Sequence, residues 1–400
     1  MKVIFLSFAL LIAWLVIDYN LGRWHHLKNV SRRHYPTRRG KWLLFNDGQE
    51  LFTNIFQDIV DAKHHIHILF YIVKNDNVSR EFLTLLRKKA QEGVTVRLLV
   101  DRIGSHIPKK TIKKLRESGV QFAYSNRIKL PFIFYSLNYR NHRKITIVDG
   151  TIGYLGGFNI GKEYLGQDPE LGYWRDFHLK IFGDGVQDLQ SEFLLDWHKA
   201  TGNHDVISFE HTGYYPKLLK GQTPMQFVPT DGAFMKEFVI NFIKKAQSEI
   251  MIGTPYFIPG NEVVNEILAA RKRGVKVTIL VPLKADHAFV KEASYPYFKN
   301  LLKAECEIYR YIRGFYHGKI LLVDGTFCDI GTANFDKRSF FINKEINCLI
   351  TDPIFIEKIR NEYMRDIQFN AERLTMKIYN NRPYLQRGKE LLSTMVSDLL

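Results

Sequence analysis

A histidine and a lysine two residues apart occur in two matching stretches of the chain. The first stretch reads NHRKITIVDG and contains His142 and Lys144; the second reads YHGKILLVDG and contains His317 and Lys319. In an extended strand, residues i and i+2 point to the same side, so each pair presents an imidazole and an ammonium together. One such pair is compatible with an ordinary solvated strand. Two copies with identical internal spacing, 175 residues apart, indicate a repeated reactive site.

The repeat continues beyond each histidine as His-x-Lys-x4-Asp-x6-Gly-x2-Asn. Displacement at a phosphodiester needs a nucleophile on one side of the phosphorus and a proton donor for the leaving alkoxide on the other. Two histidines supply this pair, while lysine and asparagine side chains supply charge and hydrogen bonds for the phosphate oxygens. We therefore predict that His142 and His317 are nucleophile and general acid, and that the phosphate cradle comprises Lys144, Lys319, Asn159 and Asn334.

Each histidine also needs a partner on its second ring nitrogen, which fixes the tautomer. In YWRDFH, Asp176 is the acid that we expect beside His142, and in RSFFINKE, Glu345 is the acid that we expect beside His317. The alternative for both acids is a surface ion pair with a neighbouring arginine, Arg175 or Arg338 respectively.

The aspartates of the motifs, Asp149 and Asp324, complete the candidate catalytic set. Each follows an apolar strand and precedes a glycine, where aspartate side chains accept bonds from backbone amides, so we expect them to stabilise turns. Lysines stand where a metal-dependent enzyme would carry clustered carboxylates. We therefore predict no metal and no other cofactor.

Similarity between the two halves of the chain extends beyond the motifs. The segment 86–100 matches 268–281, each a helix that ends near a glycine and is followed by an apolar strand, as in βαβ units. Downstream, helices with apolar residues at intervals of three to four are expected over 186–197 and 354–366. We predict an α/β fold of two pseudo-twofold-related halves, each a mixed sheet flanked by helices, with the motifs at their interface.

The charge balance indicates the kind of partner. The chain carries 57 Lys and Arg against 41 Asp and Glu, a net charge of +16, which favours either nucleic acid or an anionic membrane. The three cysteines show no C-x-x-C spacing, so neither a disulfide framework nor a zinc site is indicated.

The N-terminus favours the membrane. Residues 3–17 carry no charge. This run is shorter than the roughly 20 apolar residues of a spanning helix, so spanning and re-entrant insertion are both open. One basic residue precedes it and seven follow by residue 41, which predicts a body on the cytoplasmic side. We expect anionic lipid and not nucleic acid as the partner, and the following divisions: membrane anchor 1–22, basic linker 23–40, first half 41–215, second half 216–375 and C-terminal helical tail 376–400.

Four stretches resemble the phospholipase D superfamily, whose two His-x-Lys-x4-Asp motifs act through a phosphohistidine. They are NYRNHRKITIVDGTIGYLGGFNIGKEY, YWRDFHLKI, TPYFIP and HGKILLVDGTFCDIGTANFDKRSFFINKEIN, and the resemblance covers about residues 40–400. Within the superfamily the chain is similar to bacterial cardiolipin synthases, in a shorter form with one N-terminal apolar segment. This resemblance implies a bacterial cell-membrane enzyme that transfers a phosphatidyl group between two phosphatidylglycerols without a metal, with His142 as nucleophile.

Other functions fit parts of the pattern. A phospholipase D, or a phosphatidyltransferase with another alcohol acceptor, would use the same residues. A nuclease of the superfamily suits the basic charge but has little use for the apolar N-terminus. Two intact motifs disfavour a non-catalytic membrane scaffold.

Two segments that precede the motifs are candidates for lipid contact. Residues 127–140 place aromatic side chains between basic ends, and residues 295–303 have similar chemistry. Pro131 disfavours a central strand, and bases beside aromatics suit an anionic membrane surface. We expect both segments, with Phe132 and Phe134 in the first, to enter the leaflet; burial in the core is the alternative.

Overall fold

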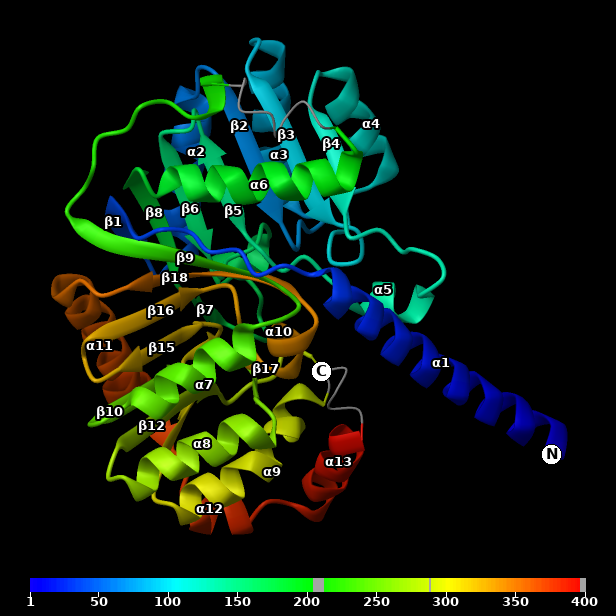
Figure 1. Ribbon diagram of the computed structural model, residues 1–400, viewed down its shortest axis with the longest axis vertical. Helices are drawn as coiled ribbons and strands as arrows, with labels where there is room; N and C mark the ends of the chain where they lie inside the picture. Colours follow the sequence, from blue (N-terminus) through cyan, green and yellow to red (C-terminus); the bar gives the residue numbers. More distant parts are fainter. Residues whose placement is uncertain (204–211, 288, 396–400) are drawn as a thin grey trace.

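A computed structural model describes residues 1–203, 212–287 and 289–395. One 15-stranded mixed sheet runs through the body with helices on both faces, and a long N-terminal helix projects from it (Figure 1). The predicted α/β class is confirmed.

The first half of the sheet has the order β1-β8-β6-β5-β2-β3-β4. Its strands are β1 (Arg38–Phe45), β2 (His65–Phe70), β3 (Thr95–Asp101), β4 (Gln121–Ser125), β5 (Ile145–Val148), β6 (Ile152–Gly156) and β8 (His178–Gly183). Its helices are α2 (Gly48–Asp61), α3 (Asn77–Gln91), α4 (Lys109–Glu117) and α6 (Val186–Thr201).

The second half repeats this order as β9-β18-β16-β15-β10-β12-β13, followed by the short edge strand β19 (Ala371–Arg373). Its strands are β9 (Thr223–Asp231), β10 (Glu249–Gly253), β12 (Lys276–Pro282), β13 (Glu307–Tyr311), β15 (Ile320–Val323), β16 (Phe327–Gly331) and β18 (Lys344–Ile350). Its helices are α7 (Met235–Lys245), α8 (Asn261–Lys272), α9 (Val290–Lys303) and α11 (Pro353–Asn370).

Matching local signals produce matching elements in the two halves. Gly93 and Gly274, which follow α3 and α8, both have a φ of +91°, a conformation that glycine adopts without steric cost. The strand after each helix pairs in parallel with the strand before it, β3 with β2 and β12 with β10. The predicted βαβ units are therefore present in both halves.

The two half-sheets join at the antiparallel pair β1–β9, where Gly40 lies opposite Thr223. We expected one sheet in each half, whereas the structure makes them one continuous sheet. One core cluster packs across this junction, beneath α6 and α11, and each half has a further core of its own. The junction is therefore part of the protein's main core.

Buried ion pairs reinforce the junction. Arg143, which has no exposed surface, lies 2.9 Å from Glu192, 2.8 Å from Asp196 and 2.7 Å from Asp231. Lys344 on β18 pairs with Asp196 on α6 at 2.7 Å. Removing one partner from such a buried network leaves an uncompensated charge, which destabilises a fold strongly.

Short elements connect the halves and close the chain. They are α5 (Ile133–Asn138), β7 (Tyr173–Arg175), β11 (Phe257–Ile258), β14 (Gly314–Tyr316), β17 (Phe335–Asp336), α10 (Lys337–Phe341), α12 (Met376–Asn380) and α13 (Tyr384–Met395). Strand β7 pairs with β14, and β11 with β17. The first of these pairs joins residues that are far apart in sequence and lie beside the candidate site.

Helix α1 (Lys2–Asn29) is apolar and exposed over most of its length. In length and composition it is a helix that can cross a membrane. It continues to Asn29, so the first residues of the expected linker are helical. Its inner end packs on α5, where Asp18 accepts a bond from the backbone N–H of Tyr135 at 2.9 Å.

The two expected lipid-contact segments differ from each other. Residues 295–303 lie in α9, where Phe298 and Leu301 are buried in the core of the second half, so the lipid-contact prediction for that segment is wrong. In the first segment, the half-buried Phe132 and Phe134 face rings of α1. Leu130, with 81% of its surface exposed, is the most exposed large apolar side chain of that segment, and Ile128 and Leu137 are exposed to a smaller extent.

Candidate active site

The motif histidines stand just before β5 and β15, in backbone contact with the opposite half. The N–H of His142 donates to the carbonyl of Lys344 at 2.9 Å, and the N–H of His317 donates to the carbonyl of Arg175 at 2.6 Å. Each histidine is thus positioned by a strand of the other half.

The same crossing supplies the acids. His142 Nδ1 lies 3.0 Å from each carboxylate oxygen of Glu345, and His317 Nδ1 contacts Asp176 Oδ2. Our prediction that each acid serves the histidine of its own half is wrong. The acids directly follow Lys344 and Arg175, whose carbonyls bind the opposite histidines, so backbone pairing across the interface brings each acid to the other motif.

Both acids are buried and held from behind. Glu345 accepts bonds from the Thr332 hydroxyl at 2.6 Å and the Ser339 hydroxyl at 2.9 Å. Asp176 accepts from the backbone N–H of Phe177 at 2.8 Å and packs against Gly157, where a Cβ would lie 2.1 Å from its Oδ1. Neither acid forms the alternative surface ion pair.

Electrostatics favours ionised acids. Burial alone raises the pKa of Asp176, but Lys319 and His317 outweigh it and the pKa lies below its ordinary value. At Glu345, burial is likewise outweighed, here chiefly by His142, and the pKa is lowered. Ionised carboxylates can only accept, so each Nδ1 carries the proton and each Nε2 is left as the available nitrogen.

Both imidazoles favour the neutral form. Burial and the neighbouring Lys319 lower the pKa of His317 to about 3, against the opposing effect of Asp176. Burial also lowers the pKa of His142, although Glu345 opposes it. In the described part of the chain, neither Nε2 atom has a hydrogen-bond partner. A neutral Nε2 is the form of histidine that attacks phosphorus.

The two lysines lie behind the histidines. Lys144 Nζ donates to the carbonyl of His142 at 2.7 Å, and Lys319 Nζ donates to the carbonyl of His317. Lys319 Nζ also lies 2.7 Å from His317 Nδ1; because both groups are donors, we assign the Nδ1 proton to Asp176. Burial lowers the pKa of both lysines, to about 8 at Lys319.

A cavity of about 300 Å³ connects the motifs. Its wall includes both histidines and both predicted asparagines, namely His142, Asn159, His317 and Asn334. The sequence prediction that the two halves form one site is consistent with this shared wall. The roles of the individual residues in catalysis remain predictions.

The asparagines are held in different ways. Asn159 accepts from the backbone N–H of Ile72 at 3.1 Å and donates to the Tyr164 hydroxyl at 3.2 Å. Asn334 donates to Asp336 at 2.9 Å, while its buried Oδ1 has no partner among the described residues. Burial raises the pKa of Asp336 to about 6, so a proton on this carboxyl group is accessible near neutral pH.

The motif aspartates lie at the far ends of β5 and β15 from the histidines. Asp149 accepts from the backbone N–H groups of residues 63–65 at 2.7 to 2.9 Å. Asp324 accepts from those of residues 247–249, at 2.7 Å from Ser248. These bonds to backbone amides are the contacts that we expected of both aspartates, and they favour a structural role. The inclusion of both aspartates in the candidate catalytic set stays a prediction.

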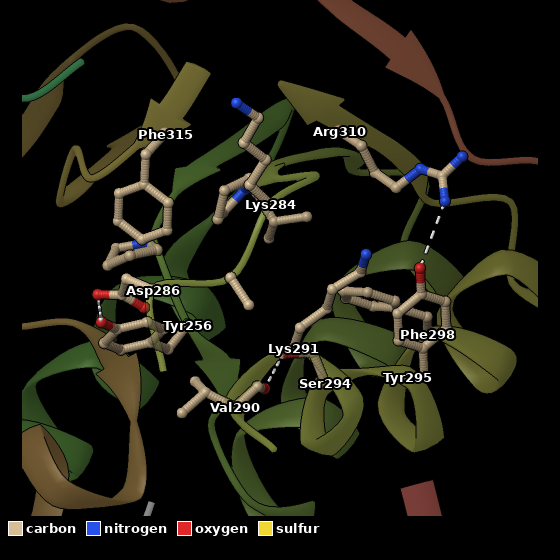
Figure 2. A pocket seen from close by; sticks show the side chains of 14 residues that line it. Tyr256, Lys284, Asp286, Val290, Lys291, Ser294, Tyr295, Phe298, Arg310 and Phe315 are labelled. Carbon is tan, nitrogen blue, oxygen red and sulfur yellow. Dashed lines mark hydrogen bonds between the residues drawn. The ribbon is translucent and has the colours of Figure 1, made fainter. Parts of the chain in front are cut away.

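A second pocket adjoins the cavity (Figure 2). Tyr256, Asp286 and Val290 contribute to both walls, and the Tyr256 hydroxyl donates to Asp286. Lys284 and Arg310 stand at its edge in the view of Figure 2. With a volume of about 20 Å³ it is too small for a phosphate group, so the larger cavity is the candidate reaction chamber.

Sequence reasoning missed several supporting residues. The ring of Tyr71 packs edge-on against His142 at 5.0 Å and lies 5.4 Å below Lys144 Nζ. Thr332 and Ser339 hold Glu345. Thr332 occupies the position of Gly157 in the repeat. A hydroxyl side chain in one half where the other half has glycine was the sequence feature that could have indicated the partner of Glu345.

No group of three or more histidine, cysteine, aspartate or glutamate residues in the described ranges is arranged to hold a metal ion. Metal independence remains a prediction.

Comparison with known proteins gives the family. Residues 55–197 and 239–367 match the family described as "Cardiolipin synthase, PLD-like domain". The chain belongs to this family. It is 39% identical over 402 residues to the minor cardiolipin synthase ClsB of Bacillus subtilis (strain 168), covering 100% of this chain and 99% of that protein. It is 40% identical over 382 residues to a cardiolipin synthase of Oceanobacillus iheyensis, covering 94% of this chain and 78% of that protein.

Two solved structures share the fold of this cardiolipin synthase family member. A phosphatidylserine synthase of Haemophilus influenzae Rd KW20 aligns with a TM-score of 0.69 at 17% identity, covering 94% of this chain and 99% of that one. A polyphosphate kinase of Porphyromonas gingivalis aligns with a TM-score of 0.56 at 14% identity, covering 88% of this chain and 53% of that one. The resemblance to the phospholipase D superfamily is confirmed.

Proposed function

We propose that the protein is a cardiolipin synthase that transfers a phosphatidyl group from one phosphatidylglycerol to another, giving cardiolipin and glycerol. The main observation that supports this proposal is that His142 and His317 line one cavity, each with its Nδ1 bound to an acid of the opposite half. Family membership and the near full-length similarity to a minor cardiolipin synthase support the same reaction.

The reaction proceeds in two displacements at one phosphorus. Nε2 of the neutral His142 attacks the phosphorus of the donor lipid, and the bond to the glycerol oxygen breaks. His317 gives that oxygen the proton of its Nε2 from the doubly protonated form, which the bound anionic phosphodiester and Asp176 stabilise. His317 then takes the proton from the terminal hydroxyl of the second phosphatidylglycerol. The resulting oxygen attacks the phosphohistidine, and His142 leaves as a neutral imidazole.

The surrounding groups provide orientation and charge. Glu345 and Asp176 fix the tautomers and stabilise each imidazolium when it forms. We propose that Lys144, Lys319, Asn159 and Asn334 balance the charge on the phosphoryl oxygens. Side chains that are fixed by burial before substrate binds need little reorganisation as that charge develops.

The order of the two histidines has its own test. The assignment of His142 as nucleophile rests on the superfamily resemblance, whereas Lys319 beside His317 favours a neutral ring there also. Rapid quench with denaturing detergent at mildly alkaline pH, which preserves the acid-labile phosphorus–nitrogen bond, followed by peptide mapping, should locate the label of phosphorus-labelled phosphatidylglycerol on His142. Label on His317 would reverse the order and leave the reaction itself unchanged.

The function is tested with purified full-length protein in detergent and phosphatidylglycerol as the only lipid. We expect mass spectrometry to show cardiolipin and equimolar glycerol, with either H142A or H317A lowering the rate by several orders of magnitude. Phosphatidic acid as the product would instead indicate a phospholipase D. A histidine variant that keeps a tenth of the activity would remove that histidine from the mechanism.

The proposed location is a bacterial cell membrane with the catalytic body on the cytoplasmic side. The support is the apolar α1 together with the seven bases that follow its uncharged run. A reporter fused to the C-terminus of the full chain, and probed with a protease in sealed spheroplasts, should be protected. Cleavage of the reporter in intact spheroplasts would place the body outside.

A further inference from the structure

A groove of about 430 Å³ lies between the inner end of α1 and the second half of the body. Helix α1 lines it with Asn20 and Arg23, α7 with Lys236, α8 with Asn261, and α10 with Lys337 and Phe341. It is separate from the reaction cavity, which has none of these residues in its wall.

The groove is positively charged. Arg23 and Lys236 each lie 5.3 Å from the ring centre of Phe341, so two cations meet at one aromatic side chain. Lys337 contributes a third cation. Among the described residues of its lining, the acid is Glu262, whose side chain is 70% exposed and pairs with Lys236 at 2.8 Å. The net positive charge is complementary to an anion.

The position of the groove along α1 indicates which anions surround it. An α-helix rises about 1.5 Å per residue, so the about 30 Å of a hydrocarbon core extends from Lys2 to the vicinity of Leu21. Arg23 then lies at the level of the lipid headgroups, and Asn20 lies at the boundary of the hydrocarbon core. Helix α5 packs on α1, and the exposed Leu130 precedes α5 in the chain.

We propose that this groove binds the phosphodiester headgroup of an anionic phospholipid of the leaflet in which α1 ends. The bound lipid fixes the body against the membrane beside the reaction cavity, because Lys337 directly follows Asp336, which lines that cavity. The proposal depends on the insertion of α1 and on the groove, and not on the reaction proposed above.

The test measures lipid retention by native mass spectrometry, with phosphatidylglycerol added to the full chain in detergent. All samples carry H142A, so that the lipid is not consumed. We expect K236Q/K337Q to retain one phosphatidylglycerol fewer per chain than its parent, or to bind it at least tenfold more weakly. The control K272Q/K303Q removes two exposed lysines at the other ends of α8 and α9 and should match the parent.

A single substitution separates charge from folding. N261D places a negative charge in the groove at the first residue of α8, where an acid stabilises a helix. It should weaken retention of phosphatidylglycerol while the thermal midpoint is held or raised. Equal retention by the parent, K236Q/K337Q and N261D would overturn the proposal. Equal retention of phosphatidylglycerol and phosphatidylcholine by the parent would also overturn it, since the groove would then not select an anion.

Discussion

The two motif histidines differ in what surrounds Nδ1. His142 faces both oxygens of Glu345, whereas His317 faces one oxygen of Asp176 with Lys319 nearby. The sequence provides all five side chains but not the pairing, because pairing depends on how Lys344 and Arg175 contact the opposite half. A search for the acid within the same half cannot find that arrangement.

The crossed pairing predicts which variant affects which ring. D176N should shift the ¹⁵N resonances of the His317 ring and leave those of the His142 ring unchanged. E345Q should shift the resonances of His142 and leave those of His317 unchanged. Each should lower kcat by roughly 10² to 10⁴ with little change in KM, since loss of an orienting acid disturbs the tautomer more than binding. E345D should recover part of the rate. The opposite pattern of resonance shifts would restore the same-half pairing.

Helix α1 and α5 meet at a glycine. A Cβ at Gly22 would lie 2.5 Å from Tyr135 Cβ and 2.9 Å from Phe132 Cβ, so only glycine allows this approach. Sequence reasoning read residues 127–140 as a lipid-facing segment because its aromatic residues lie between bases. The structure instead uses Phe132 and Phe134 to contact α1. Composition alone does not distinguish burial against a second helix from burial in lipid.

G22A should therefore separate the two helices. We expect faster hydrogen exchange over residues 133–139 and a thermal midpoint lowered by an amount equivalent to about 1–3 kcal/mol, typical of overpacking. G388A is the matched control, since Gly388 lies in helix α13, where an added Cβ would meet nothing within 4 Å. Replacing a helical glycine in open space should leave stability unchanged or slightly raised. Unchanged exchange in G22A would show that the contact is dispensable.

At the scale of the whole molecule, the sequence predicted the two halves and their order of elements, because hydrophobic periodicity and terminal glycines are local signals. It did not predict that β1 and β9 would join the half-sheets, since nothing local in RRGKWLLF or TPMQFVPTD identifies the partner edge. The buried Arg143 network was also missed. Its acids come from α6 and β9, and only the assembled fold brings them to the residue between His142 and Lys144.

The repeat also gives a matched test of pH dependence. His178 lies opposite Gly156 on β6, where Asn347 lies opposite Gly331 in the second half. Burial lowers the pKa of His178 to about 3, and its Nδ1 has no partner among the described residues. The unfolded chain binds a proton at this histidine below about pH 6.5, whereas the folded chain does not until about pH 3. The contribution of the neutral His178 to the free energy of unfolding is therefore fully present above about pH 6.5 and is lost as the pH falls.

H178N should reduce this dependence. Urea unfolding in detergent, monitored by tryptophan fluorescence, gives the free energy of unfolding at each pH between 7 and 4.5. We expect this free energy to fall more steeply with decreasing pH in the wild-type protein than in H178N. The difference should approach about 1.4 kcal/mol per pH unit, the limit for one group. Other buried groups, such as Asp329, whose pKa is raised to about 7 by burial, are common to both proteins and cancel in the comparison. H64N, at an exposed position, should follow the wild type. Parallel curves for H178N and the wild type would mean that His178 is protonated in the folded protein, with a counter-charge supplied by the neighbouring Asp176.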